Sequence, residues 1–320
     1  MKTTAYCSPE KLHDITFAVD LDGRKLTEWM QDRGAAVNDR LRREGVVLMR
    51  GLNVISSGQF ATIASALFGG SLLSYSNRST PRTELRSNVY TSTEYPKEES
   101  IPQHNENAYS HEWPMKIAFL CMVAAEQGGA TPIADSRKIY RRVPADIREK
   151  FERKGVTYVR HYSSVGLSWK ETFQVNTRDE VDAYCERHGI VSQWLDEDWL
   201  RTRQVCPATA VHPHTGAKVW FNQAHLFHVS NHTEEDRKAL MQTFGEHFLP
   251  RHAYYGDGEA IEEYALETIR AIYEEEKLSF AWRSGDLLLL DNMLYSHGRD
   301  PYEGPRKVLV AMAEARTWAD

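Results

Sequence analysis

The chain has 320 residues, enough for one large domain or two modest ones with a sizeable buried core. It carries 39 basic and 45 acidic residues, a formal charge of −6, which gives no reason to expect nucleic acid or an anionic membrane as a partner. Hydrophobic residues make up 41% of the chain, typical of a globular protein, and no apolar run approaches the ~18 residues of a membrane-spanning helix.

The N-terminus and the cysteines indicate in which compartment the protein is expected to work. The first residues, MKTTAYCSPEKLHD, contain no apolar segment, so we expect no signal peptide and a cytoplasmic location. The cysteines are far apart and form no CxxC pair, which argues against a disulfide framework and a cysteine-built zinc site. No repeat or linker marks a boundary, so we predict a single domain over residues 1–320, with an N-terminal helical and strand extension to about residue 45.

The first predicted elements alternate between helix and strand. Residues 24–43 have helical composition, and residues 46–49 form a short apolar run typical of a strand. Residues 57–68 predict a helix closed by two glycines. From residue 88 to 122 the pattern becomes β-rich and is broken by prolines, and it ends in a predicted strand at residues 116–122.

The middle of the chain predicts two helices, a strand-rich stretch and two further helices. Asp135 is a good N-cap for a helix to residue 142, and residues 145–153 continue as a second helix. Short strands around turns are expected over residues 156–227. Acidic amphipathic helices follow at residues 233–248 and 258–277.

The last third predicts two strands with a loop between them. Residues 287–290 are four leucines, a pattern that suits a strand buried on both faces, and Asp291 and Asn292 are expected to end it. Residues 306–312 supply the partner strand. The chain therefore predicts an α+β fold in which many short strands form a sandwich or barrel with helices around it.

A possible metal site lies in the segment Ile101-Pro-Gln-His-Asn-Glu106. In a strand, residues two apart point to the same face, so His104 and Glu106 would place an imidazole beside a carboxylate. A second imidazole would complete the two-histidine, one-carboxylate triad that holds non-haem iron(II). His297, in the polar loop after the leucine strand, is the candidate for this third ligand.

A cation follows that loop at the start of the last strand. Arg306 would share a face with Val308 and Val310, whereas Lys307 would point the other way. A buried arginine needs an anionic partner, because an unpaired buried charge is costly. A small dicarboxylate could satisfy it through a bidentate contact, with Lys307 as the alternative anchor.

With these residues in place, the chain resembles the iron(II) and 2-oxoglutarate-dependent oxygenases of the taurine dioxygenase (TauD/TfdA) type. The resemblance covers roughly residues 40 to 315. It rests on four blocks in the family's order: His104-Asn-Glu106, Gly128-Gly-Ala-Thr-Pro-Ile-Ala-Asp135, Trp220-Phe-Asn-Gln223, and Gly285 to Asn292 continuing through His297 to Arg306. Because Glu106 stands where most members have Asp, the chain is similar to the amino-acid hydroxylases of peptide natural-product pathways.

The resemblance implies a double-stranded β-helix (jelly-roll) core with iron(II) bound by His104, Glu106 and His297. It also implies that 2-oxoglutarate lies with its distal carboxylate on Arg306 and the hydroxyl of Thr131. The implied activity uses dioxygen, converts 2-oxoglutarate to succinate and carbon dioxide, and hydroxylates a C–H bond of an amino acid or peptide-like metabolite, free or tethered to a carrier protein. Desaturation, epoxidation and cyclisation are alternatives within the same chemistry.

Two more distant functions stay open at this point. A zinc hydrolase could be built on a second group of histidines, at positions 212, 214, 225 and 228, and a cupin-like protein could bind a metabolite without turnover. Asn222 is the candidate for a polar contact with the substrate, because the family's matching stretch lies near the pocket. Loops at residues 74–84 and 158–174 are expected to complete that pocket. The sequence says nothing about the oligomeric state.

Overall fold

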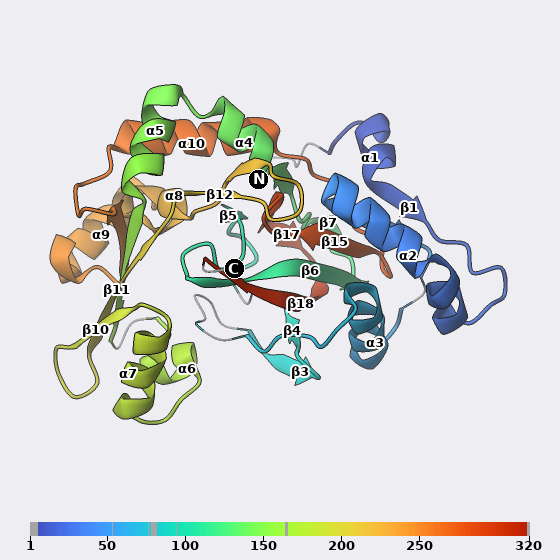
Figure 1. The fold of residues 1–320 in the computed structure, drawn as a ribbon, viewed down its shortest axis with the longest axis horizontal. Coiled ribbons are helices and arrows are strands. Elements are labelled where there is room, and N and C mark those ends of the chain that lie inside the picture. The colour runs from blue at the N-terminus through green and yellow to red at the C-terminus, as the bar shows by residue number, and fades with distance from the viewer. Residues whose placement is uncertain are drawn as a thin grey trace.

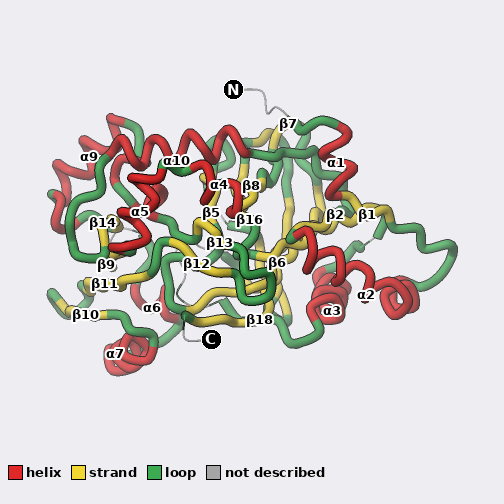
Figure 2. The backbone as a smooth tube through the Cα atoms, turned by 45° about the horizontal axis from the view of Figure 1, so that its top comes forward, coloured by secondary structure: helices red, strands yellow, loops and turns green. Residues whose placement is uncertain are grey.

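The computed structural model describes residues 6–52, 54–75, 77, 82–93, 95–163 and 166–318. Strands occupy the middle of the molecule and helices lie around them (Figure 1, Figure 2). The helices are α1 Pro9–Ile15, α2 Leu26–Glu44, α3 Ser57–Phe68, α4 Ser136–Arg142, α5 Ala145–Lys154, α6 Trp169–Phe173, α7 Arg178–Arg187, α8 Ala224–Phe227, α9 Glu234–Phe244 and α10 Glu263–Glu276. None of the helices in the described ranges combines the length and the apolar character needed to cross a membrane.

The largest sheet has seven strands and carries most of the core. In spatial order they are β1 Thr16–Ala18, β2 Val46–Arg50, β15 Leu287–Asp291, β6 Glu112–Val123, β18 Lys307–Thr317, β4 Val89–Thr91 and β3 Glu84–Arg86. Neighbouring strands are antiparallel except β1 and β2, which are parallel. The N-terminal extension therefore contributes a strand to this sheet.

The large sheet is buried on both faces, and this explains its apolar strands. Leu287 and Leu289 of β15 pack in the cluster formed with α2 and α3, while Leu288 and Leu290 pack in a second cluster on the opposite face. All four leucines are 0% exposed, which confirms the prediction for this strand. The second cluster includes Ile133, so this face of the sheet turns toward the strands that carry the site.

The remaining strands form smaller sheets. A three-stranded sheet has the order β5 Ile101–His104, β16 Tyr295–Arg299 and β8 Ile133–Asp135. A four-stranded sheet has the order β10 Val191–Trp194, β11 Leu200–Cys206, β9 Val156–Tyr162 and β14 Arg251–Tyr255. Two ribbons pair β12 Thr209–Val211 with β13 Lys218–Trp220, and β17 Tyr302–Glu303 with β7 Gln127–Gly128. Helices α4, α5 and α10 pack together over β9 and β14.

Most predicted elements are confirmed, and the differences have local causes. The helix predicted over residues 233–248 ends at Phe244, because Gly245 leaves the helical conformation with φ of 64°. The helix predicted over residues 258–277 begins only at Glu263, after a turn at Gly258. The prediction of strands and turns over residues 156–227 is wrong for α6, α7 and α8, and capping boxes at Ser168 and Thr177 begin the first two of these helices. Helix α1 was not predicted either, although Ser8 caps it and a proline occupies its first turn.

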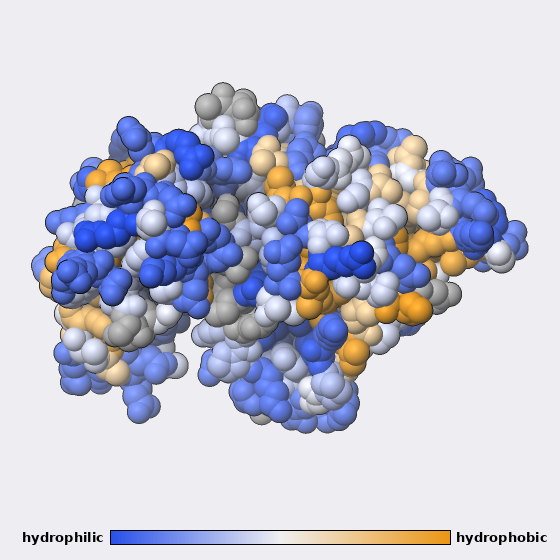
Figure 3. Space-filling view, turned by 90° about the horizontal axis from the view of Figure 1, so that it is seen from below, coloured by the Kyte–Doolittle hydropathy of each residue, from blue (hydrophilic) through white to orange (hydrophobic). Residues whose placement is uncertain are grey.

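The surface is uneven in its polarity. Seen from below, most of the face is hydrophilic, and hydrophobic side chains gather in the half that contains α2 and α3 (Figure 3). A furrow enters this face between that half and the half built on the four-stranded sheet (Figure 3).

Candidate metal centre

Strand pairing brings the two predicted histidine ligands together. His297 lies in strand β16 and not in the predicted loop, because residues 295–299 pair with β5 and β8. His104 at the end of β5 lies directly opposite it in this antiparallel pair, and their ring centroids are 4.5 Å apart. The ladder shifts register after His297, where Gly298 stands: a Cβ there would lie 2.6 Å from the carbonyl oxygen of Ile101. The glycine after His297 is therefore required by the close approach of the two backbones.

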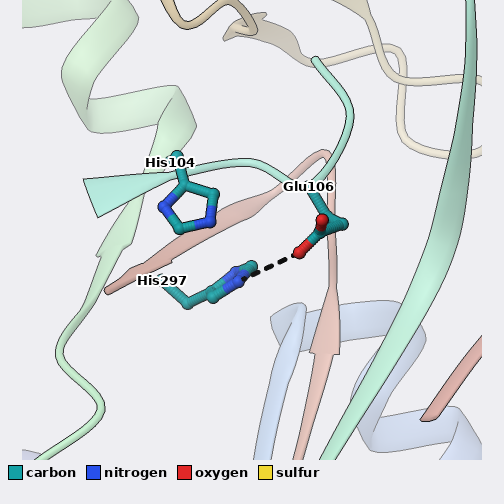
Figure 4. A group of neighbouring side chains, drawn as sticks. All are labelled: His104, Glu106 and His297. Carbon is teal, nitrogen blue, oxygen red and sulfur yellow. Dashed lines mark ion pairs between the residues drawn. The ribbon is translucent and has the colours of Figure 1, made fainter. Parts of the chain in front are cut away.

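Glu106 completes the group, but from a turn instead of a strand. Strand β5 ends at His104, so the prediction that His104 and Glu106 lie in one strand is wrong. Ligand atoms of His104, Glu106 and His297 nevertheless all lie within 4.8 Å of one another, and the three side chains point toward one another (Figure 4). Nε2 of His297 is 3.6 Å from Oε2 of Glu106.

Backbone clamps fix the position of Glu106. The side chain of Asn292 accepts a hydrogen bond from the Glu106 backbone N–H at 2.7 Å and donates one to the Glu106 carbonyl at 2.9 Å. The side chain of Gln223 donates to the carbonyl of Asn105 at 2.7 Å. Neither Asn292 nor Gln223 was expected to take part in the site, although each belongs to a block that carries the family resemblance.

The carboxylate of Glu106 is held ionised. Nη2 of Arg82 donates to it at 2.8 Å and the hydroxyl of Tyr75 donates to it at 3.1 Å. Burial by itself opposes ionisation, but Arg82 and His297 outweigh it and hold the pKa of Glu106 well below its usual range. Tyr75 and Arg82 lie in the loop at residues 74–84 that the sequence predicted near the pocket, but neither residue was singled out, because both lie outside every block of the resemblance.

Both imidazoles are suited to bind a metal. Nδ1 of His104 lies 2.8 Å from the carbonyl oxygen of Pro102, which leaves Nε2 with its lone pair directed into the site. Burial and the neighbouring His297 lower the pKa of His104 to about 3, so this ring is neutral. Two imidazoles and one ionised carboxylate, close together and buried, are the donor set that iron(II) oxygenases use, so the residues present fit that metal.

Arg306 lines the same cavity as the two histidines. Its Nε donates to the carbonyl of Gly129 at 2.9 Å, and its Nη2 donates to the hydroxyl of Thr131 at 3.3 Å. The indole N–H of Trp282 donates to the same hydroxyl at 3.1 Å. Because the Thr131 oxygen accepts two hydrogen bonds, its own hydrogen is directed to another acceptor. Trp282 lies outside every block of the resemblance and was not predicted to take part in the site.

The surroundings of Arg306 suit an anion. Among the described residues no carboxylate comes within ion-pair distance of its guanidinium, and burial together with the neighbouring Arg299 lowers its pKa to about 10. Lys307, the alternative anchor, is exposed. The arginine precedes β18, which begins one residue later than predicted, and it lines the cavity together with Val308 as expected.

Asn222 lies beyond the end of β13 and its side chain has backbone partners. It is 0% exposed, donates to the carbonyl of Ala208 at 2.8 Å and accepts from the N–H of Ala224 at 3.0 Å. These bonds support the start of α8, and the predicted substrate contact of Asn222 stays a prediction. The predicted pocket loops fall partly on residues 76, 78–81, 164 and 165, which lie outside the described residues.

The second group of histidines does not assemble. His212 contacts Asp291 at 2.9 Å, His214 is exposed in the turn between β12 and β13, and His225 contacts the carbonyl of Gln103 at 2.9 Å. Across the described ranges, the only group of three or more histidine, cysteine, aspartate or glutamate side chains close enough to hold a metal ion consists of His104, Glu106 and His297. The geometry therefore gives the zinc hydrolase hypothesis no site on these histidines.

Comparison with known proteins agrees with this geometry. The family model described as "Taurine catabolism dioxygenase TauD, TfdA family" matches residues 10–312. The chain belongs to this family. It is 41% identical over 279 residues to the dapdiamide synthesis protein DdaC of Enterobacter agglomerans, covering 87% of this chain and 84% of that protein. It is 28% identical over 301 residues to a clavaminate synthase-like protein of Arabidopsis thaliana, covering 90% and 87%.

Solved structures share the fold at low sequence identity. A Burkholderia xenovorans protein assigned by name to the alpha-ketoglutarate-dependent taurine dioxygenases superposes with a TM-score of 0.52 at 14% identity, covering 98% of this chain and 89% of that one. The PvcB protein of Pseudomonas aeruginosa superposes with a TM-score of 0.51 at 15% identity, covering 87% and 78%. The fold is thus a mixed helix-and-sheet fold of the TauD type.

Family membership establishes the class of enzyme. The protein is a 2-oxoglutarate-dependent dioxygenase, and its cofactor, cosubstrate and oxidant are iron(II), 2-oxoglutarate and dioxygen. The resemblance drawn from the sequence is confirmed. The hydrolase and the non-catalytic binding protein are excluded as the primary function.

Proposed function

We propose that this dioxygenase hydroxylates a C–H bond of an amino acid or an amino-acid-derived metabolite, free or bound to a carrier protein, in a biosynthetic pathway for a natural product. One observation carries the chemistry: His104, His297, Thr131 and Arg306 line a single cavity. The substrate class is supported by the glutamate at position 106 and by the 41% identity to a protein named for dapdiamide synthesis.

In this proposal His104, Glu106 and His297 bind the iron, and Arg306 and Thr131 bind the distal carboxylate of 2-oxoglutarate. Iron(II) with 2-oxoglutarate and dioxygen supplies the oxidising power, with succinate and carbon dioxide as coproducts. The protein contributes geometry: Asn292 fixes the turn that carries Glu106, and the ring of Phe119 lies 4.9 Å from the ring of His297 and shields one side of it from water.

The architecture and location complete the proposal. We infer that the large sheet and the three-stranded sheet form the two faces of a double-stranded β-helix, within a single domain over residues 1–320. The burial of the large sheet on both faces supports this arrangement. A cytoplasmic location stays a prediction from the sequence.

The test begins with the purified apoprotein under anaerobic conditions. Adding iron(II) and 2-oxoglutarate should produce the weak visible charge-transfer band of the chelate, and admitting oxygen should remove the band as succinate forms. Glu106→Ala should abolish both signals, whereas His214→Ala, at an exposed histidine, should leave them unchanged. A Glu106→Ala enzyme with full activity would refute the assignment of the ligands.

The product identifies the reaction. Mass spectrometry of a converted substrate should show the gain of one oxygen atom and a new hydroxyl group. Loss of two hydrogen atoms instead would assign desaturation or cyclisation, and one added oxygen without a hydroxyl group would assign epoxidation.

A further inference from the structure

A second cavity, of about 230 Å³, is lined by residues of β9, β14 and α8. The described residues that line it include two arginines, Arg160 and Arg251, and two histidines, but no aspartate or glutamate. Its other walls are largely apolar, among them Phe227 and Leu249. A cavity with this lining is electropositive, and it selects anions over cations.

The two arginines form a like-charge pair. Arg160 of β9 and Arg251 of β14 are direct partners in the antiparallel ladder, a position in which equal charges repel. Arg160 is only 9% exposed, and its Nη1 donates to the side chain of Asn77 at 3.0 Å. Two guanidinium groups on one side of the ladder repel each other, and a carboxylate bound between them would reduce that repulsion.

Arg251 has no anionic partner among the described residues. In the part of the chain that the structure describes, no hydrogen bond or ion pair reaches its guanidinium, whose contact is the ring of Phe227, with the Cζ atom 5.7 Å from the ring centroid. Burial, with a further contribution from Arg160, lowers the pKa of Arg251 below its ordinary value. The planar fork of this side chain is therefore available to a ligand in the cavity.

The arginine pair is connected to the loop that carries Glu106. Tyr109, three residues after the ligand, donates its hydroxyl hydrogen to the carbonyl of Asn77 at 2.7 Å, and the side chain of Asn77 accepts from Arg160. The ring of Tyr109 also lies 5.1 Å from the ring of Phe227. A short chain of contacts through Tyr109 and Asn77 thus connects the anion site to the turn that carries Glu106.

We propose that the Arg160 and Arg251 pair binds a free carboxylate of the substrate, so that this enzyme acts on a small amino-acid-like acid and not on an acyl group esterified to a carrier. The inference rests on the proposed function and specifies its substrate class. Two guanidinium groups match a carboxylate in shape and charge. Pockets for drug-sized ligands measure about 300–1,000 Å³, and this smaller cavity suits one end of a small metabolite.

The experiment compares acids with their neutral counterparts. The anaerobic protein, loaded with iron(II) and 2-oxoglutarate, receives a mixture of the common L-amino acids, the matched mixture of their C-terminal amides, or 4′-phosphopantetheine as the probe for a carrier arm. Thermal unfolding reports binding, and succinate formation after admission of oxygen reports productive binding. We expect the acids to raise the melting temperature and the rate, and the amides and phosphopantetheine to leave both unchanged.

Variants locate the effect. Arg251→Met should raise the half-saturating concentration of the active acid at least tenfold, and Arg251→Lys should restore part of the affinity. Without ligand, Arg251→Met should melt at the same or a higher temperature than the wild type, because one of two repelling charges is gone; a purely structural arginine would show a fall. Arg203→Met is the matched control, since Arg203 is exposed on the neighbouring strand β11.

The outcomes separate the two proposals. A wild-type protein that forms the iron–2-oxoglutarate band but responds equally to acids and amides, or to neither, overturns this inference alone. Stabilisation by phosphopantetheine without an effect of the acids also overturns it and favours a carrier-bound substrate. Absence of the band in the wild type overturns the proposed function instead.

Discussion

Replacing Asn292 with alanine should weaken iron binding without touching a metal ligand. The Asn292 side chain is 0% exposed and makes three hydrogen bonds to backbone groups: the N–H of Glu106 at 2.7 Å, the carbonyl of Glu106 at 2.9 Å and the carbonyl of Pro114 at 2.8 Å. Alanine removes all three and leaves the backbone groups buried. The turn that presents Glu106 then loses its anchor to the end of β15.

The magnitude follows from these contacts. A buried polar group left without a partner costs about 1–3 kcal/mol, so three such groups lower the free energy of unfolding by about 3 kcal/mol at the low end of that range. Loss of a residue that orients a metal ligand typically lowers metal affinity 10–100-fold. We therefore expect Asn292→Ala to show both effects, while the apoprotein keeps its fold by circular dichroism.

Two assays measure the prediction. Urea unfolding of the apoprotein gives the change in stability, and anaerobic titration with iron(II) in the presence of 2-oxoglutarate gives the change in affinity. Asn176→Ala is the control, because Asn176 is exposed and its side chain makes no bond to the described residues. An Asn292→Ala protein with iron affinity within twofold of the wild type and stability within about 0.5 kcal/mol would refute the reasoning.

Three further predictions concern the cosubstrate and pH. Arg306→Gln should raise the KM for 2-oxoglutarate more than tenfold, and Lys307→Gln should not; the reverse result would move the anchor to Lys307. Trp282→Phe removes the indole donor to Thr131, a bond worth about 1 kcal/mol, so the same KM should rise about fivefold; an unchanged KM would show that the hydroxyl needs no such support. Burial lowers the pKa of His225 to about 4, so this ring is neutral in the folded protein. Because the unfolded chain binds that proton near pH 6.5, the free energy of unfolding should fall from pH 6.5 to 4, by up to about 3 kcal/mol from this group; urea unfolding of His225→Phe should show a shallower fall, and an equal slope would contradict the assignment.

Local patterns were sufficient for most elements of secondary structure. The leucine run of β15 and the Asp135 cap of α4 each predicted their element, because burial on both faces and helix capping depend on residues close in sequence. Errors came where a single backbone conformation decided the outcome. Helix α9 ends before Gly245, which has a φ of 64°. The composition of the segment predicted a helix but did not show at which residue the backbone would leave the helical conformation.

The proposed metal ligands show which features of the site the sequence predicts and which depend on the tertiary structure. The sequence by itself predicted the types of the proposed ligands and their order, since two histidines and a carboxylate followed by an arginine, in four ordered blocks, resemble the pattern of this family. Only the tertiary structure decided their geometry: pairing of β5 with β16 sets His104 opposite His297 across 193 positions of the chain. It also revealed Arg82 and Asn292 beside Glu106, and the pair Arg160 and Arg251. Such contacts join residues distant in sequence, and their position depends on packing and hydrogen bonding that no local pattern encodes.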